Sequence, residues 1–104
     1  MSMSTSTAAA TTFAALEACF AADLAAIIGS DLPRSLAPTR FIGLVKEVRD
    51  VLGASSHRPW QEASKDLAIA AEYLTDALTA PADDQAGVLA WARTHLRDAI
   101  TAAT

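Results

Sequence analysis

The residue types that usually carry chemistry are few in this chain, and none has the spacing of a reactive site. The two histidines, His57 and His95, have no cysteine or second histidine at metal-ligand spacing, which argues against a structural zinc site. The Glu-x-x-His tetrapeptide of di-iron helical bundles does not occur. The four glycines are isolated, so they form no phosphate-binding loop. We therefore expect neither a metal nor a cofactor.

Cys19 is the single cysteine, so it cannot form an internal disulfide. It lies beside the alanine-rich side of a predicted helix, which favours a buried free thiol in a reducing compartment. No nucleophile elbow surrounds Cys19 or a serine near either histidine. Paired carboxylates occur only on one strip that we expect to be solvated. The sequence therefore predicts a protein that is not an enzyme.

This acidic strip lies on a predicted helix over residues 59–79, opposite its apolar side. It consists of Glu62, Asp66, Glu72 and Asp76. Ile69 and Tyr73 lie within it, four residues apart, and Lys65 offsets part of its charge. An apolar pair ringed by carboxylates is typical of a small protein interface that attracts a basic partner. The alternative is an ordinary solvated face with two scattered apolar residues.

Trp91 is a second departure from the core pattern. On a predicted helix over residues 83–102 it lies beside Val88 and His95, away from the stripe that contains Leu89 and Leu96. Tryptophan is costly to expose and frequent at binding hot spots. Trp91 and Val88 therefore either pack against a neighbouring helix or subunit, or form a second patch for a protein partner.

Basic side chains gather around the second predicted helix, where Arg34, Arg40, Lys46 and Arg49 outnumber the acids. A basic face of this kind suits nucleic-acid phosphates. Interleaved acids and the lack of an aromatic platform or a helix-turn-helix glycine turn argue against that role. The net charge of −4 over 104 residues also argues against a general polyanion binder. A nucleic-acid-associated regulator is therefore our alternative hypothesis.

The elements that position these residues begin with a stretch over residues 8–28 that is apolar on two sides. At about 100° per residue, its large side chains share one face: Phe13, Leu16, Phe20, Leu24 and Ile27. Alanines cover the other face, and only Glu17 and Asp23 interrupt the pattern. A helix that is apolar all round is normally buried all round, which predicts a central helix or the seam of a homodimer. The alternative is that alanine serves only as a good helix former. The predicted seam comprises Ala14, Ala18, Ala21, Ala22 and Ala25.

The ends of this first helix carry recognisable signals. Gly29 follows the last apolar residue, where a left-handed C-cap is expected. Thr11 or Thr12 is an alternative N-cap if the first turn frays.

Three more helices are predicted from the 3.6-residue periodicity, with a proline, glycine or aspartate at each boundary. They span residues 38–52 with Gly53 as the stop, 59–79 with Pro59 at the start, and 83–102 with Asp83 or Asp84 as the N-cap. Their expected core faces are Phe41, Leu44, Val45, Val48, Val51 and Leu52; Trp60, Ala63, Leu67, Ala70, Leu74, Ala77 and Leu78; and Leu89, Ala92, Leu96, Ala99 and Ile100.

Four helices with short connections predict an all-α fold, a four-helix up-down antiparallel bundle. The loop over residues 30–38 is the one connection long enough to allow a parallel crossover instead. Residues 8–104 are expected to form this single domain after a flexible polar tail over residues 1–7. The N-terminal residues lack the positive flank of a signal peptide, and the acids of the first helix prevent it from spanning a bilayer. We therefore expect a cytoplasmic protein.

The leading hypothesis is a non-enzymatic protein-binding module, an adaptor or inhibitor that occupies a partner surface and forms a homodimer. A structural subunit of a larger assembly is a further alternative. No family resemblance is evident in the sequence.

Overall fold

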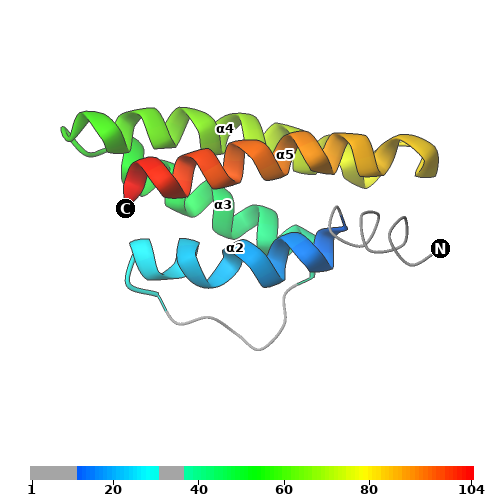
Figure 1. Cartoon of the computed structure of the whole chain (residues 1–104). Helices are drawn as coiled ribbons and strands as arrows, with labels where there is room; N and C mark the ends of the chain where they lie inside the picture. The colour runs from blue at the N-terminus through cyan, green and yellow to red at the C-terminus, as the bar shows by residue number, and fades with distance from the viewer. Residues whose placement is uncertain (1–11, 31–36) are drawn as a thin grey trace.

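The computed structural model describes residues 12–30 and 37–104, and this part of the chain forms only α-helices (Figure 1). They are α2 (Phe13–Ile27), α3 (Pro38–Gly53), α4 (Arg58–Thr79) and α5 (Ala82–Ala103). The all-α class is confirmed, and the bounds of α3 and α4 match the prediction to within one residue, whereas α5 begins two or three residues before the start that an Asp83 or Asp84 N-cap predicts. The predicted tail over 1–7 and the first turn over 8–11 lie outside the described residues. No helix in the described ranges is long and apolar enough to cross a membrane.

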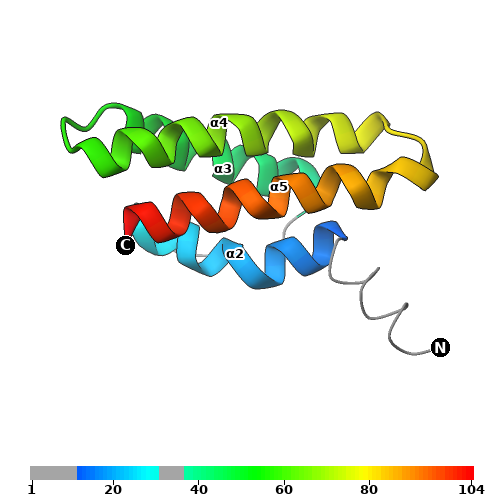
Figure 2. The ribbon, with the colours of Figure 1, turned by 45° about the horizontal axis from the view of Figure 1, so that its top comes forward.

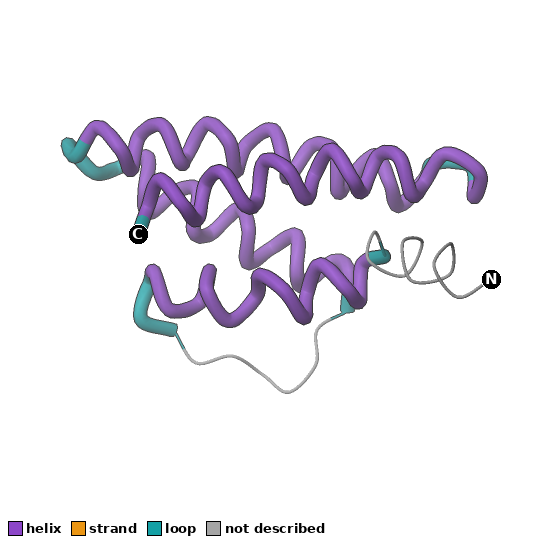
Figure 3. Tube along the Cα trace, viewed as in Figure 1, coloured by secondary structure: helices purple, strands orange, loops and turns teal. Residues whose placement is uncertain are grey.

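The helices do not alternate strictly in direction. α4 and α5 form a long antiparallel hairpin, and α3 runs antiparallel to α4 (Figures 1 and 2). In both views α2 and α3 run in the same direction. The end of α2 at Ile27 and the start of α3 at Pro38 therefore lie at opposite ends of the bundle. The predicted up-down order is therefore wrong at this first connection. The other two connections are short turns (Figure 3).

Local hydrogen bonds close both ends of α2. The Oγ1 of Thr12 accepts a hydrogen bond from the amide of Ala15 at 3.1 Å, which makes Thr12 the N-cap. At the other end the amides of Gly29 and Ser30 donate to carbonyls of the last turn, the pattern of a Schellman motif. Gly29 has a φ of 66°, which glycine adopts without strain. The predicted C-cap at Gly29 is confirmed.

The first residue of α5 differs from the prediction. Its N-cap is Pro81, whose carbonyl accepts the amides of Asp84 and Gln85, so the helix begins before either aspartate. Asp83 and Asp84 lie in the first turn and make no side-chain cap. The predicted aspartate N-cap is therefore wrong, although both carboxylates still favour the positive end of the helix dipole.

The buried side chains form one core shared by all four helices. Most of the predicted apolar stripes are confirmed, but Val51 and Leu78 are 43% and 42% exposed. Val51 lies about 120° around α3 from Val45, the centre of the buried side, whereas Ile42 lies only about 60° away and is buried. Leu78 is next to the last residue of α4, where the exposed connection to α5 begins.

The alanines of α2 divide between the core and the surface. Ala21 and Ala25 are buried beside Leu24, whereas Ala14, Ala18 and Ala22 are exposed. Ala21 and Ala25 therefore belong to the core of this chain and not to an outer seam, because the buried sector of α2 is wider than the row of large side chains.

Cys19 is exposed, so the predicted buried thiol is wrong. Five residues separate it from Leu24, which places it about 140° away from the centre of the buried sector. The thiol therefore lies on the outer side of α2 with the exposed alanines.

α3 and α4 approach closely where a glycine faces a serine. A methyl group added to Gly53 would lie 2.8 Å from the Oγ of Ser64, and that hydroxyl donates a hydrogen bond of 2.8 Å to the carbonyl of Arg49. Gly53 is the last residue of α3 and does not have a positive φ. The predicted stop at Gly53 is confirmed, and its missing side chain also allows the two helices to pack closely.

We expect Gly53→Ala to lower the free energy of unfolding by about 1 kcal/mol, because Ser64 must rotate and lose its hydrogen bond. In a Ser64→Ala background the same change should be close to neutral, since the obstructing hydroxyl is gone. Urea unfolding of the two single variants and the double variant measures this coupling. Simple additivity of the two changes would contradict the packing role of Gly53.

Candidate functional site

Side chains from α4 and α5 meet in a connected series on one face of the hairpin. The ring of Tyr73 stacks with the rings of Trp91 and His95, with centroids 6.5 and 5.9 Å apart and planes within 22°. His95 Nδ1 lies 3.0 Å from Oδ1 of Asp66 in a hydrogen bond. The series therefore runs from Trp91 through Tyr73 and His95 to Asp66 and ties the two helices together.

Contacts spread along the hairpin place α4 and α5 in one register. Trp60 Nε1 donates to the carbonyl of Ala103 at 3.2 Å near one end, and Gln85 Nε2 donates to the carbonyl of Ala77 at 3.1 Å near the other. The contact between His95 and Asp66 lies between them and fits the same register. The stacked rings are thus held at a fixed level of two rigid helices.

The structure joins two patches that the sequence analysis kept apart. Ile69 and Tyr73 come from α4, Val88 and Trp91 from α5, and the stacking of Tyr73 on Trp91 makes them one surface. Trp91 is 61% exposed and Ile69 38% exposed, while Tyr73 and Val88 are half-buried against the core. We call this surface the aromatic face: Asp66, Ile69, Tyr73, Val88, Trp91 and His95.

Sequence reasoning did not assign His95 to this site. Its four-residue spacing from Trp91 placed both rings on one side of α5, which was the available signal. The partner across the hairpin, Asp66, was assigned only as part of a solvated strip. The side chains of His95 and Asp66 are 23% and 31% exposed. The Asp66 part of the strip is therefore partly buried between α4 and α5.

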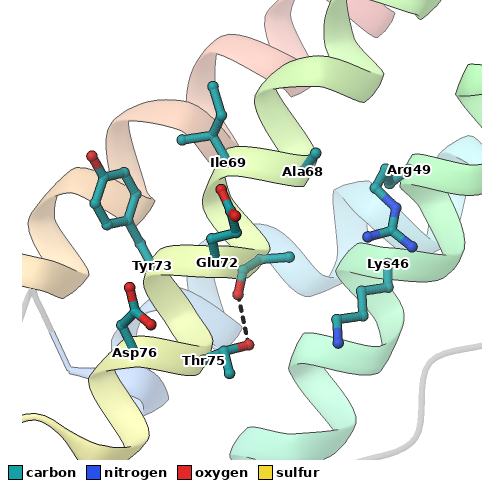
Figure 4. A pocket seen from close by; sticks show the side chains of 9 residues that line it. Lys46, Arg49, Ala68, Ile69, Glu72, Tyr73, Thr75 and Asp76 are labelled. Atoms are coloured by element: carbon teal, nitrogen blue, oxygen red, sulfur yellow. Dashed lines mark hydrogen bonds between the residues drawn. The ribbon is translucent and has the colours of Figure 1, made fainter.

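The remaining predicted carboxylates border the aromatic face on its outer side. Glu62 lies 3.8 Å from the ammonium group of Lys65. Glu72 and Asp76 line a groove of about 520 Å³ between α3 and α4, together with Ile69 and Tyr73 (Figure 4). Lys46 and Arg49 stand on the opposite wall from these acids (Figure 4). The groove thus carries opposite charges on its two sides.

The predicted basic face is not one surface. Nine residues separate Arg40 from Arg49, which puts them on opposite sides of α3 by helix geometry. Arg49 pairs with Asp50 at 2.9 Å, and Arg34 lies outside the described residues. The groove acids opposite Lys46 also oppose the approach of a phosphate.

The chemistry of the aromatic face is that of contact. Its exposed groups are aromatic rings, one aliphatic side chain and a carboxylate. Among the described residues, no serine, threonine or cysteine is hydrogen-bonded to the His95–Asp66 pair. Within residues 12–30 and 37–104, no cluster of three or more histidine, cysteine or acidic side chains could hold a metal ion. The arrangement is suited to pack against another molecule.

Comparison of the chain with known protein families, with curated proteins and with solved structures finds no match. The assignment of a function therefore depends on the residues of the face itself.

Gly87 lies one turn before Trp91 in the interior of α5, and packing does not require a glycine there. A methyl group at this position would meet no atom within 4 Å, and the glycine does not have a positive φ. Glycine in a helix interior costs about 1 kcal/mol relative to alanine. The chain thus keeps a locally unfavourable residue beside its most exposed aromatic ring.

We expect Gly87→Ala to raise the free energy of unfolding by about 1 kcal/mol, because the helix gains intrinsic propensity and nothing clashes. Gly29→Ala is the matched control and should lower it, since its φ of 66° strains any residue with a Cβ. Thermal or urea unfolding measures both changes. A loss of stability in Gly87→Ala would show that this glycine has a packing role after all.

Proposed function

We propose that this protein is a non-enzymatic protein-binding module that acts as an adaptor or inhibitor through its aromatic face. The observation that carries the proposal is the exposure of Trp91, 61% even after it stacks on Tyr73. Covering the rest of the indole in a complex contributes about 2–3 kcal/mol at about 25 cal/mol per Å². Tryptophan and tyrosine are also the side chains most enriched at interface hot spots.

The surroundings of Trp91 support binding by a preformed surface. The ring of Tyr73, which is itself stacked on His95, holds it from α4, so little side-chain freedom is lost when a partner covers it. The exposed acids at the margin supply a charged rim, which affects partner choice and association rate more than affinity.

We further propose that the protein forms a homodimer through the outer side of α2. Ala14, Ala18 and Ala22 from the predicted seam are exposed there, and Cys19 lies among them. Small side chains allow the close approach of a second helix. Ala21 and Ala25 are left out of this interface because they are buried within the chain.

Other roles have less support. The basic residues of α3 are divided between two sides of the helix, so we do not propose nucleic-acid binding. The cytoplasmic location and the role as a structural subunit stay predictions from the sequence.

We expect Trp91→Ala to abolish capture of the protein's partners from its native host, because it removes the centre of the face. Loss of a hot spot of about 2 kcal/mol corresponds to roughly thirtyfold weaker binding. Leu78→Ala removes another exposed apolar side chain outside the aromatic face and should leave capture unchanged. Quantitative mass spectrometry of proteins bound to each immobilised variant is the measurement. An identical set bound to wild type and Trp91→Ala would refute the assigned face.

We expect Ala22→Arg to convert a dimer into a stable monomer, since a charged side chain replaces a small one on the outer side of α2. Ala90→Arg, at an exposed alanine of α5, is the matched control and should stay dimeric. Sedimentation equilibrium measures the mass, and maleimide labelling of Cys19 should slow as the concentration of wild type rises. Labelling that is independent of concentration, in a wild type that sediments as a monomer, would exclude this dimer.

A further inference from the structure

Two rows of side chains cross the aromatic face, and both have the same order of chemical types. On α4 the row is Glu62, Ile69 and Asp76, and on α5 it is Asp84, Trp91 and Asp98. Seven residues separate the members of each row, and seven residues return a helix to within about 20° of the same side. Each row therefore has a large apolar group at its centre and a carboxylate at either end, and all six residues are exposed.

The antiparallel register aligns the two rows. The contact of Gln85 with Ala77 lies near one end and that of Asp66 with His95 near the other. This register places Asp76 near the level of Asp84, and Glu62 near the level of Asp98. The apolar and aromatic centre is thus bounded by pairs of carboxylates about 10 Å away on each side, at about 1.5 Å per residue.

Few cations of the chain compensate these acids. Lys65 lies 3.8 Å from Glu62, and Arg97 lies 3.7 Å from Asp98. Within residues 12–30 and 37–104, neither Asp76 nor Asp84 forms an ion pair, so the end of the face near the α4–α5 turn keeps a net negative charge. A positively charged partner therefore gains most at this end.

Gly87 exposes the indole toward the same end. The Cα–Cβ bonds of a helix tilt toward its N-terminus, so the side chain of Trp91 starts in the direction of the turn that contains Gly87. This glycine has no packing role, and a methyl group added to it would meet no atom within 4 Å. The face of the indole is therefore open to a flat group that arrives between Gly87 and the carboxylate of Asp84.

We propose that the aromatic face recognises a basic segment of a partner protein, with an arginine guanidinium stacked on Trp91 beside Asp84. The planar guanidinium both stacks on an indole and pairs with a carboxylate, and further basic side chains meet the carboxylates at the ends of the rows. This inference rests on the proposed function and adds the chemistry of the partner. A second copy of this chain does not fit, since it would bring the same carboxylates to the contact.

The test uses the full chain labelled with ¹⁵N and a short peptide of arginines spaced by glycine and serine. At low salt the peptide should shift the indole N–H signal of Trp91 and the amide of Gly87, while the indole signal of Trp60 serves as an internal reference. Added salt should weaken binding, and the lysine version of the peptide should bind more weakly than the arginine version. Trp91→Ala should weaken binding about three- to thirtyfold, the range expected for a cation stacked on an aromatic ring.

Two neighbouring aspartates provide a matched pair of charge variants. Asp83 and Asp84 are both exposed and both lie in the first turn of α5, but consecutive residues point about 100° apart. Asp84→Asn should weaken peptide binding and Asp83→Asn should not. Gly87→Gln should also weaken it while leaving the fold intact, because the new side chain covers the open side of the indole.

The inference is overturned if the arginine peptide binds Trp91→Ala as tightly as wild type, or if the glutamate version binds equally well. It is also overturned if Asp83→Asn and Asp84→Asn have equal effects. A neutral leucine-containing peptide separates this failure from that of the proposed function. If that peptide shifts the indole N–H signal of Trp91 and the arginine peptide does not, the aromatic face binds protein but does not select a basic segment.

Discussion

The close packing of α4 against α5 is the constraint on which the rest of this structure depends. Buried alanines recur at seven-residue intervals on both helices, Ala63, Ala70 and Ala77 on α4 and Ala92 and Ala99 on α5. In the register of the hairpin, Ala70 lies level with Ala92 and Ala63 with Ala99. Small side chains at facing positions reduce the distance between helix axes. The flanking side chains of Tyr73 and His95 meet across this seam.

This packing explains why the aromatic face is rigid and why it is on the hairpin. The core beneath it is apolar, with no buried polar or charged residue among those described. The arrangement of the helices is therefore determined by how well the apolar side chains fit together. Aromatic rings then stand on the seam, held by two helices at once. A loop would present the same residues with a larger loss of conformational freedom upon binding.

Much of the fold followed from the sequence, because helix periodicity and proline signals are local. The bounds of α3 and α4 and the alanine row of α4 were predictable in this way. The direction of α2 was not, since it depends on how the helix docks and not on its own residues. The prediction of which alanines of α2 form an outer seam was partly wrong for the same reason. Ala21 is as apolar as Ala22, and only the helices packed against α2 decide which of the two is buried.

The candidate site was predictable residue by residue but not as a whole. Ile69, Tyr73 and Trp91 each departed from the core pattern of their own helix, which marked them as special. That they form one surface depends on the hairpin register, which single-helix patterns do not contain. The same limit concealed the pairing of His95 with Asp66, because the two lie 29 residues apart in the chain.

The parallel course of α2 and α3 has a consequence for how the molecule forms. α3, α4 and α5 follow one another through short turns, so their mutual contacts close small loops and arise early with little entropic cost. α2 precedes them in the chain, yet it must wait for a surface composed partly of the last helix, α5, before its large side chains find a site. We therefore expect the N-terminal helix to dock last, onto a scaffold formed by the other three helices.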